Sequence, residues 1–372
     1  MSPCLLNIAN EFLSAQSVAT VHALGSGLIN DTYLVHCAGV GARDFVLQRV
    51  NSSVFAAPQL IIDNIQKVST HLAQQHHSGD ETKTLILPTL YQTHAGNYFF
   101  VDADGGFWRA MSYIPHTYSI KVLSNVTQAE AVGFALGAFH HALLSIAPND
   151  LHVTLPGFHI TPRYLAQYDD ILAHGATLPP LQEWYDCHAA VAQGRSGAGV
   201  LENAKFSGQL TERPIHGDPK LDNFLFDRTT QGVVSLIDLD TLQPGLIHYD
   251  IGDCIRSCCN TGGESPSGID AVDFNLDYCR GILQGYFSGA QNTLTAKDIE
   301  YLYAAIRLIP WELGLRFLTD HLAGDRYFKV ATRGQNLHRA RVQFRLYAEI
   351  VRHRTYLLQI IASLAHTSVK AI

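Results

Sequence analysis

HGDPKLDN, at residues 216–223, is the most informative segment of this sequence, and Asp238 follows it by fifteen residues in the segment SLIDLDT. Asp218 and Asn223 flank a tight turn that contains a proline. Asp238 leaves an expected strand at residues 233–237, which can return antiparallel beside the short strand that follows Asn223. The spacing therefore predicts three oxygen-bearing side chains on loops next to one small strand pair.

These three side chains have the chemistry of a phosphoryl-transfer site. Transfer from Mg²⁺-bound ATP needs a carboxylate to accept or orient the proton of the acceptor hydroxyl, and oxygen ligands to hold the metal against the phosphates. We interpret Asp218 as the catalytic base, and Asn223 and Asp238 as ligands of Mg²⁺, so ATP and Mg²⁺ are the predicted cofactors. The alternative is a polar β-turn in which Asp218 and Asp222 are only local turn formers.

The composition predicts a folded globular protein. Of 372 residues, 16% are charged and 47% are hydrophobic, which is too little charge and too much apolar surface for disorder. The net charge of −7 is spread without a run of five like charges, which argues against nucleic acid or a membrane surface as a partner. The most apolar helical stretch, residues 131–147, is short for a bilayer span and is expected to be a buried core helix. A small molecule is the expected partner, and the sequence does not indicate the oligomeric state.

The cysteines indicate a reducing compartment. There are seven, an odd number, and the first residues show no basic region followed by an apolar stretch, so we expect a cytoplasmic protein with reduced thiols. One alternative is a zinc site with the ligands Cys254, Cys258, Cys259 and His248. Their spacing fits no two-plus-two ligand pattern, and small core residues are the preferred interpretation.

The first third of the chain predicts a small sheet. The segments TVHAL, TYLVHC, FVLQRV, TLILPTLY, NYFFVD and FWRAMSYI, between residues 20 and 114, are short β-type runs rich in Val, Tyr, Phe and Leu. One interruption, at residues 57–75, repeats apolar residues at the spacing of one helical face. We expect this helix to pack on the sheet.

The rest of the chain is mainly helical in its periodicity. Helices are expected to open at two capping arrangements, Thr127 with Glu130 and Thr295 with Asp298. Pro310 is expected to kink or split the second of these helices. The sequence therefore predicts a second, mostly α-helical lobe.

The order of these features resembles that of the aminoglycoside phosphotransferase family of small-molecule kinases, which share the protein-kinase fold. The matching features are the small β lobe, HGDxKxxN, IDxDT and then YDIGD at residues 249–253. Within that family, four segments resemble the N-acetylhexosamine 1-kinases: GSGLINDTYLV, VLQRVNxxVF, IDLDTLxPG and ELGLRFLTDHLxGDxYF. The resemblance covers nearly the whole chain.

The resemblance implies a particular architecture. The expected fold class is α+β: a bilobal protein-kinase-like fold with a small antiparallel β-sheet N-lobe containing one helix and a larger, mainly α-helical C-lobe. Residues 1–114 would form the nucleotide-binding N-lobe. Residues 115–372 would form the helical C-lobe, with the catalytic loop and the substrate pocket.

The implied nucleotide contacts lie in the N-lobe. The glycine turn GSGLIN, at residues 25–30, stands between two strands and can bring backbone amides close to phosphates, although on its own a plain hairpin loop explains it as well. MSYI, at residues 111–114, ends the last strand, where related kinases bind adenine through the backbone. The expected contacts are Gly25, Gly27, Asn30, Gln48, Met111, Ser112 and Ile114.

One expected residue is missing. Kinases carry on the third strand a lysine that holds the phosphates and pairs with a glutamate on the helix. FVLQRV offers Gln48 on the face where that lysine is expected, with Arg49 on the opposite face. The helix has Asp63 and Gln66 in place of the glutamate, so the usual ion pair is not expected. The N-acetylhexosamine kinases resemble this sequence in having Leu-Gln on that strand.

The implied acceptor contacts lie near the end of the chain. Resemblance to the sugar kinases places Arg316 and Tyr327 in a sugar pocket. A surface salt-bridge ladder is the alternative, because Glu312, Arg316 and Asp320 lie one helical turn apart. Asp240 shares a strand face with the metal-binding aspartate, and is expected either as a substrate or second metal contact or as a solvated or capping residue.

Other residues near the predicted site have a supporting role or differ from the sugar kinases. In related kinases, an aspartate at the position of Asp250 accepts backbone hydrogen bonds from the catalytic loop. Asp253 and Arg256 can pair locally or reach the substrate cleft. Leu28 and Ser257 depart from the sugar kinases, which have a histidine and an aromatic residue at those positions.

The function predicted from the sequence is ATP-dependent phosphorylation of a hydroxyl of a small sugar, in particular the anomeric hydroxyl of an N-acetylhexosamine or a related hexose. The first alternative is another acceptor in the same family, an aminoglycoside or an amino alcohol such as a choline-like or homoserine-like compound. The second alternative is a catalytically silent nucleotide-binding scaffold, suggested by the missing lysine. The presence of Asp218, Asn223 and Asp238 disfavours the scaffold.

Overall fold

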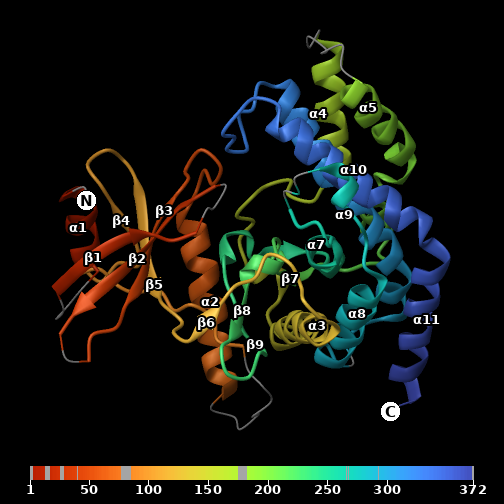
Figure 1. The fold of residues 1–372 in the computed structure, drawn as a ribbon. Coiled ribbons are helices and arrows are strands. Elements are labelled where there is room, and N and C mark those ends of the chain that lie inside the picture. Colours follow the sequence, from red (N-terminus) through yellow and green to blue (C-terminus); the bar gives the residue numbers. More distant parts are fainter. Residues whose placement is uncertain are drawn as a thin grey trace.

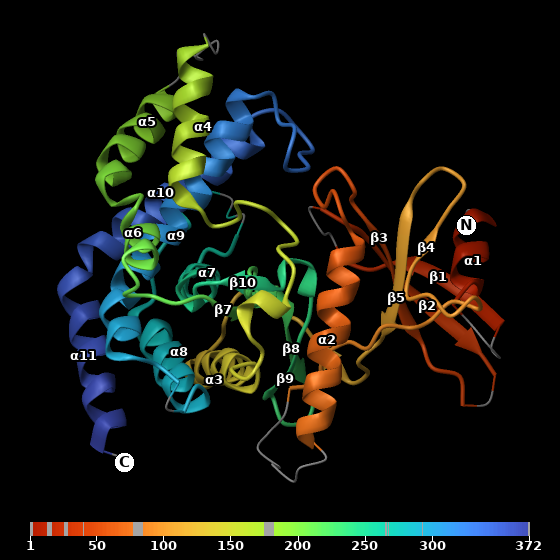
Figure 2. The ribbon, with the colours of Figure 1, turned by 180° about the vertical axis from the view of Figure 1, so that it is seen from behind.

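The computed structural model describes residues 3–12, 17–25, 29–39, 41–76, 85–174, 182–264, 266, 268–291 and 293–370. These residues form two lobes side by side (Figures 1 and 2). The sheet lobe contains α1 (Pro3–Asn10), α2 (Gln59–His76) and a five-stranded sheet, and the helical lobe contains the elements from β6 (Thr117–Tyr118) to α11 (Arg354–Lys370). The expected α+β architecture, with an antiparallel sheet beside a larger helical part, is confirmed.

The sheet has the strand order β1-β2-β3-β5-β4, and every neighbouring pair is antiparallel. Its strands are β1 (Ser17–Ala23), β2 (Asp31–Ala38), β3 (Phe45–Val50), β4 (Phe100–Val101) and β5 (Phe107–Ser112). In the register of β3 with β5, Leu47 lies opposite Ala110 and Gln48 lies opposite Arg109. Because directly paired residues share a face, the first pair packs with α1, and the second pair lies on the face toward α2 and the helical lobe.

Helix α2 connects the two lobes. Its apolar residues were expected to pack on the sheet, but they join a core that also contains Phe107 of the sheet and Leu136 of the helical lobe. Buried Asn64 attaches the helix further: its amide nitrogen donates to the carbonyl oxygens of His152 and Leu242, both at 2.8 Å. Its amide oxygen accepts from the His152 N–H at 2.8 Å. Figure 2 shows α2 between the sheet and two strands of the helical lobe, β8 (Phe224–Asp227) and β9 (Val233–Leu236).

Two expectations for the sheet lobe were incomplete. The lobe has a second helix, α1, which covers one face of the sheet with Ile8 and Ala9. The expected strand TLILPTLY is not a strand in its described part, where only Ile86 and Leu90 form single bridges, to β9 and β5 respectively. Pro88 lies between these two residues and has no N–H to donate, which explains the interruption.

The helical lobe is built around a buried helix pair, α3 (Val126–Ala142) and α8 (Leu276–Gly289). The two helices approach so closely that a Cβ on Gly133 would lie 2.0 Å from the Ile282 carbonyl oxygen, and one on Gly285 would lie 2.1 Å from the Glu130 carbonyl oxygen. Glycine at these positions allows backbone to contact backbone. The other helices are α4 (Thr161–Ala173), α5 (Gln182–Gly194), α6 (Val200–Phe206), α7 (Ile247–Cys259), α9 (Ala296–Leu322), α10 (Gln335–Arg352) and α11.

Helix starts follow the sequence in one of the two expected cases. The capping box of Thr295 with Asp298 is present at the start of α9. Helix α3 instead begins after Asn125, whose side chain accepts from the Gln128 N–H at 2.9 Å, because asparagine is a strong N-cap. Helix α9 continues through Pro310 as one element of 27 residues and is not split. None of the described helices combines the length and apolar content that a membrane span requires.

Candidate active site

The segment at residues 216–223 begins where β7 (Arg213–Ile215) ends, and the Asp250 carboxylate fixes its start. Asp250 is fully buried on α7 and accepts from the backbone N–H of His216 at 2.7 Å and of Gly217 at 2.8 Å. Gly217 has φ of 88°, and a Cβ there would lie 2.6 Å from the Thr241 carbonyl oxygen. Only glycine fits this position without strain. The supporting role expected for Asp250 is confirmed by its two hydrogen bonds.

The predicted base Asp218 forms an ion pair with Lys220, two residues further along the same loop. The Lys220 ammonium also lies 4.0 Å from a carboxylate oxygen of Asp238. Desolvation in the cleft acts to raise the pKa of Asp218, but Lys220 outweighs it and holds that pKa below its usual value. The side chain of Asp218 is 30% exposed, so an acceptor can reach it. Lys220 had no predicted role, although it lies within HGDPKLDN, two residues after Asp218.

The predicted metal ligands meet at the hairpin formed by β8 (Phe224–Asp227) and β9 (Val233–Leu236). The two strands are antiparallel, as expected, and the Ile237 N–H donates to the Asn223 carbonyl oxygen at 2.9 Å. The amide nitrogen of Asn223 donates to the Asp218 backbone carbonyl oxygen at 2.7 Å, which leaves its amide oxygen available. The structure therefore brings Asp218, Asn223 and Asp238 together at the end of one hairpin.

The electrostatics of this cluster suit a hard divalent cation. Asp238 adopts a left-handed conformation with φ of 67° at the end of the hairpin. Desolvation is the main cause that raises the pKa of Asp238 to about 7, and the neighbouring carboxylates of Asp240 and Asp218 add to it. A carboxylate and an amide oxygen are ligands that Mg²⁺ accepts, and Mg²⁺ commonly completes its shell with water and phosphate oxygens. Within the described ranges no three His, Cys, Asp or Glu side chains converge as a metal cage, so such an ion would depend on those additional ligands.

The face of β3 where a lysine was expected carries a different arrangement. Buried Gln48 accepts from Arg109 Nε at 3.0 Å and donates from its amide nitrogen to the Thr32 hydroxyl at 3.0 Å. Arg109 lies opposite Gln48 on β5 and forms a buried ion pair with Asp240 of the helical lobe. A cation is therefore present next to Gln48, supplied by the neighbouring strand. Arg109 was not predicted from the sequence, because strand alternation gives the face of a residue but not its neighbour across the sheet.

Asp240 is also hydrogen-bonded to Asn30, the last residue of the glycine turn. The amide nitrogen of Asn30 donates to the second carboxylate oxygen of Asp240 at 2.6 Å, and the Asn30 amide oxygen accepts from the Asn51 N–H at 2.9 Å. Both oxygens of Asp240 are thus bound by the sheet lobe. Gly25 has φ of 75°, which suits a tight turn, and Gly27 lies outside the described residues.

The predicted adenine contacts lie where β5 leaves the sheet. Met111 and Ser112 are the last residues of β5, and the Ser112 N–H donates to the Thr89 carbonyl oxygen at 2.8 Å. Buried Ile114 follows, and its carbonyl oxygen accepts from the Thr117 hydroxyl at 2.7 Å. This segment connects the sheet lobe to β6, so the expected adenine-binding residues occupy the connection between the lobes.

Arg316, on α9, is enclosed by aromatic rings. Its guanidinium carbon lies between 4.9 and 5.7 Å from the ring centroids of Phe158, Tyr164, Tyr327 and Phe328. Burial acts to lower the pKa of Arg316, but it is outweighed by nearby groups that include Tyr164, Tyr327 and the Asp218 carboxylate, so the pKa is raised. The predicted acceptor residues Arg316 and Tyr327 are therefore in contact with each other and near the predicted base. Tyr327 is 37% exposed.

The residues one turn before and after Arg316 do not form the salt-bridge ladder considered above. Asp320 accepts from the backbone N–H groups of Arg326, Tyr327 and Phe328, at 2.8, 2.8 and 3.0 Å. Asp320 therefore fixes the loop that carries Tyr327. Glu312, one turn before Arg316, pairs instead with His159 at 2.9 Å.

His159 connects this part of α9 to the catalytic loop. Its Nδ1 lies 2.9 Å from a Glu312 carboxylate oxygen, and its Nε2 lies 2.8 Å from the Gly217 carbonyl oxygen. Both partners can only accept, so both ring nitrogens must donate, which requires the imidazolium form. Burial acts to lower the pKa of His159, but Glu312 outweighs it and raises that pKa. Neither His159 nor Glu312 had a catalytic or supporting role in the sequence analysis.

The cysteines of α7 lie in the core. Cys254 and Cys258 are buried with their sulfurs 4.0 Å apart, and Cys259 is buried beside them. His248 Nε2 lies 2.9 Å from the Asp298 carbonyl oxygen. Asp253 and Arg256 on the same helix form the local pair that was one of two expected arrangements, at 2.7 Å.

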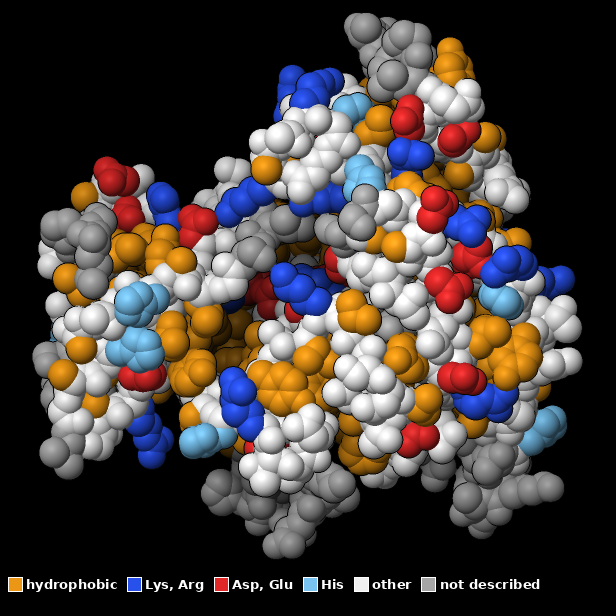
Figure 3. Space-filling view, in the orientation of Figure 1, with side chains coloured by type: hydrophobic (Ala, Val, Ile, Leu, Met, Phe, Trp, Pro, Cys, Tyr) orange, Lys and Arg blue, Asp and Glu red, His pale blue; other side chains and the backbone are white. Residues whose placement is uncertain are grey.

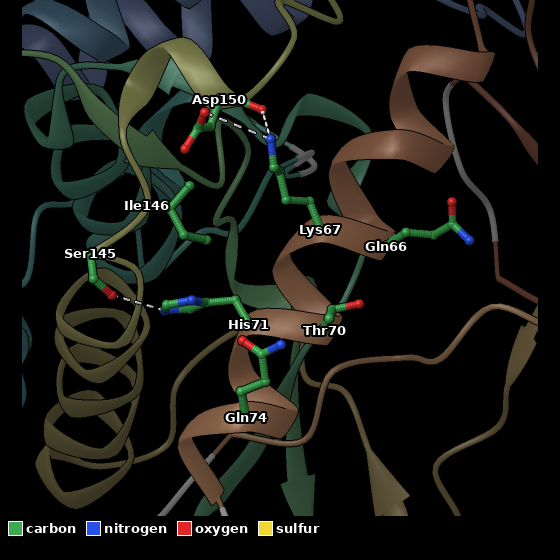
Figure 4. Close-up of a pocket in the computed structure, with 8 residues that line it drawn as sticks. All are labelled: Gln66, Lys67, Thr70, His71, Gln74, Ser145, Ile146 and Asp150. Carbon is green, nitrogen blue, oxygen red and sulfur yellow. Dashed lines mark hydrogen bonds and ion pairs between the residues drawn. The ribbon is translucent and has the colours of Figure 1, made fainter. Parts of the chain in front are cut away.

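The surface between the lobes is hollowed. Figure 3 shows this hollow, with acidic and basic side chains at its edge. A second hollow, of about 470 Å³, lies between α2 and the segment after α3 (Figure 4). Its lining residues are Gln66, Lys67, Thr70, His71, Gln74, Ser145, Ile146 and Asp150, so it is separate from the predicted site.

Comparison with known proteins gives a family and a fold. Residues 20–286 match the model of a family described as the phosphotransferase enzyme family. Among solved structures, an aminopropanol kinase associated with a microcompartment is similar with a TM-score of 0.63 at 17% identity, over 95% of this chain and 98% of that one.

Two further solved structures are similar over nearly their whole length. An aminoglycoside phosphotransferase from Alicyclobacillus acidocaldarius has a TM-score of 0.62 at 14% identity, over 97% of this chain and 96% of that one. A choline kinase from Cryptosporidium parvum has a TM-score of 0.62 at 12% identity, over 98% of this chain and 99% of that one. At these identities the structures support the fold, and the family rests on the sequence match.

Proposed function

The chain belongs to the phosphotransferase enzyme family, and from this we propose that it transfers the γ-phosphoryl group of Mg²⁺-bound ATP to a hydroxyl of a small sugar. The family makes it a kinase of small molecules. The donor, the metal and the sugar are our proposal, and the residues described above support each of them.

The observation that carries the proposal is the meeting of three side chains at one end of the β8–β9 hairpin. Asp218 and Asn223 come from the loop before β8, and Asp238 comes from the residues after β9. In this assignment Asp218 is the general base that accepts the proton of the acceptor hydroxyl. Lys220 keeps Asp218 ionised and therefore able to accept it. Asp250 and Gly217 hold the loop, so Asp218 needs little reorganisation when the acceptor arrives.

Asn223 and Asp238 would hold Mg²⁺ through their side-chain oxygens. The bound ion supplies charge that offsets the charge of the phosphates during transfer. The carboxylates near Asp238, which raise its pKa, would also favour a bound cation. Adenine would bind at the backbone of residues 112–114, between the lobes, with Met111 and Ile114 as apolar contacts.

A sugar acceptor is supported by the surroundings of Arg316. Guanidinium N–H groups can donate to hydroxyl or acetamide oxygens, and the rings around Arg316 offer apolar faces for the C–H surface of a pyranose. A polycationic aminoglycoside would meet a positive charge here, which is unfavourable. The N-acetylhexosamine 1-kinase-like activity is the specific form of this proposal, with Arg316 and Tyr327 as the candidate residues that contact the sugar. Asp240, expected from the sequence as a further contact, is buried and bound through both oxygens by Arg109 and Asn30.

An amino alcohol is the second candidate, because of one feature of α7. The Oδ2 oxygen of buried Asp253 has no hydrogen-bond partner among the described residues, while its Oδ1 accepts from Arg256. An ammonium group is a suitable partner for an unpaired carboxylate oxygen. The similar aminopropanol and choline kinases also act on compounds of this class, according to their names.

An ADP-release assay tests the proposal. The panel would contain hexoses, N-acetylhexosamines, aminoglycosides and amino alcohols, each with ATP and Mg²⁺. We expect turnover with an N-acetylhexosamine or a related hexose. Turnover restricted to amino alcohols would select the second candidate, and ATP binding without turnover of any acceptor would contradict the assignment of a sugar kinase.

A further inference from the structure

The guanidinium of Arg109 has one nitrogen, Nη1, that finds no hydrogen-bond acceptor among the described residues. Its side chain is 1% exposed, and it is held by Gln48 and Asp240 through Nε and Nη2. Its Nη1 is also buried, and no described residue accepts a hydrogen bond from it. A buried charged donor without an acceptor is strongly unfavourable. The missing acceptor is therefore expected to come from a bound molecule.

The position of Arg109 indicates which molecule this is. On β5, Arg109 precedes Met111 by two residues on the same face, about 7 Å along the strand. Its ion-pair partner Asp240 follows the predicted metal ligand Asp238 by two residues. Arg109 thus stands between the predicted adenine contacts and the predicted metal site. The phosphates of a nucleotide that joins these two points must pass beside it.

The positive charge of Arg109 stands on β5, next to the position on β3 where a lysine was expected. Gln48 occupies the lysine position and accepts from Arg109, so it orients a cation without providing one. Gln48 is itself fixed by the Thr32 hydroxyl. An arginine has five N–H donors in a rigid plane, so it can bind Gln48 and Asp240 and keep a donor for a third group. A lysine at this position lacks that geometry.

We propose that Arg109 holds the phosphates of the bound nucleotide through Nη1, and that Gln48 and Asp240 are positioning residues for its guanidinium. The charge that kinases of this fold carry on the third strand is here supplied from β5. This inference rests on the proposed function, because it requires a nucleoside di- or triphosphate in the cleft. Since Asp240 belongs to the helical lobe, the same contact joins phosphate binding to the contact between the lobes.

Nucleotide affinity tests this role without any need for turnover. Titration calorimetry in the absence of Mg²⁺ would measure the Kd of adenosine and of ADP for the wild type, for Arg109→Gln and for Arg49→Gln. Arg49 is an exposed arginine on the opposite face of β3, so it is a matched control. We expect Arg109→Gln to weaken ADP binding by about 10- to 100-fold and to change adenosine binding less than about twofold. Arg49→Gln should leave both values nearly unchanged.

The outcomes distinguish a failure of the role of Arg109 from a failure of ATP binding as such. If Arg109→Gln keeps the wild-type ratio of ADP to adenosine affinity, Arg109 is structural and this inference is wrong, while the proposed function stands. If the wild type binds neither compound, both the inference and the ATP assignment are wrong. A loss of affinity for both compounds by the same factor would also contradict a specific contact with phosphate.

Two further measurements apply if Arg109→Gln does not fold. The double variant Gln48→Lys with Arg109→Gln returns the charge to β3, and should recover most of the preference for ADP over adenosine. A crystal structure of the wild type with ADP should place Nη1 within about 3.2 Å of a phosphate oxygen. A phosphate group with no contact to Arg109 in that complex would overturn the proposal.

Discussion

Substitution of Asp218 should lower kcat without changing the affinity for ATP. Asp218→Asn keeps the shape of the side chain and removes the proton acceptor. We expect kcat to fall by about 10² or more, the range of general-base groups, with little change in ATP affinity. Steady-state kinetics and a nucleotide titration of the same variant give both values. Near-normal kcat with the true acceptor would contradict the assignment of the base.

Arg316 should affect the acceptor more than the nucleotide. If its guanidinium contacts the sugar, Arg316→Ala removes a donor worth about 1–3 kcal/mol, so kcat/KM for the sugar should fall about 5- to 100-fold. The KM for ATP should stay nearly constant. Arg280→Ala, which removes an arginine from another aromatic contact, with Tyr356, should leave both values unchanged. A lower melting temperature with normal sugar kinetics would make Arg316 a structural residue.

His159 should make the stability of the protein depend on pH. Its pKa in the folded protein is raised above the usual 6.5, so its contribution to stability is full below about pH 6.5 and is lost as the pH rises through the raised pKa. The pKa of Glu312 is lowered from 4.5, so its contribution is present above that value and is lost as the pH falls through the lowered pKa. The melting temperature of the wild type should therefore exceed that of His159→Gln most between about pH 5 and pH 6.5.

The same comparison at higher pH supplies the check. The difference in melting temperature between the wild type and His159→Gln should decrease as the pH rises through the raised pKa of His159, because the wild-type imidazolium then loses its proton. A difference that stays constant over this range would mean that His159 contributes by packing alone.

At the scale of elements, the contact between α3 and α8 should tolerate no side chain. A Cβ at Gly285 would lie 2.1 Å from the Glu130 carbonyl oxygen, so Gly285→Ala must push the two helices apart. We expect the free energy of unfolding to fall by about 1–3 kcal/mol, as for other overpacked sites. Gly268→Ala is the control, because a Cβ there would meet no atom of the described residues within 4 Å. Urea denaturation of both variants measures the difference, and equal stability would contradict the close packing.

The elements that sequence analysis predicted well are those with local signals. Strand β3 coincides with FVLQRV, and the antiparallel pairing of β8 with β9 follows from two apolar runs joined by a short turn. The capping box of Thr295 is also local. The segment around Pro88 was misjudged because its apolar composition suggested a strand while its proline prevents continuous pairing.

In the candidate site, too, only the local relationships could be predicted from the sequence. Asp218 and Asn223 lie on one short segment, so their proximity could be deduced from spacing. The pairing of Gln48 with Arg109 could not be deduced, because more than fifty residues separate β3 from β5 and only the sheet register makes them neighbours. Nor could the spacing of α9 show that Asp320 binds the backbone of a later loop, since a helical turn suggests side-chain pairs first.

At the scale of the whole molecule, Asn64 should matter because it fastens α2 to the helical lobe. Asn64→Leu leaves the Leu242 carbonyl oxygen and the His152 N–H without their buried partner, so we expect about 2–4 kcal/mol less stability. Asp63→Ala, at the next position on the same helix, removes an exposed side chain 3.9 Å from His152 and should cost less than about 0.5 kcal/mol. Denaturant unfolding of both variants checks this difference, and similar values for the two would contradict it.

Helix α9 also limits how the chain length can change. Glu312, Arg316 and Asp320 lie one turn apart, and they hold respectively the His159 imidazolium, the aromatic rings and the loop with Tyr327. Each residue of an α-helix turns its direction by about 100°. An insertion or deletion of a single residue between Glu312 and Asp320 would therefore rotate one of these side chains away from its partner. Within this span only substitutions preserve the geometry.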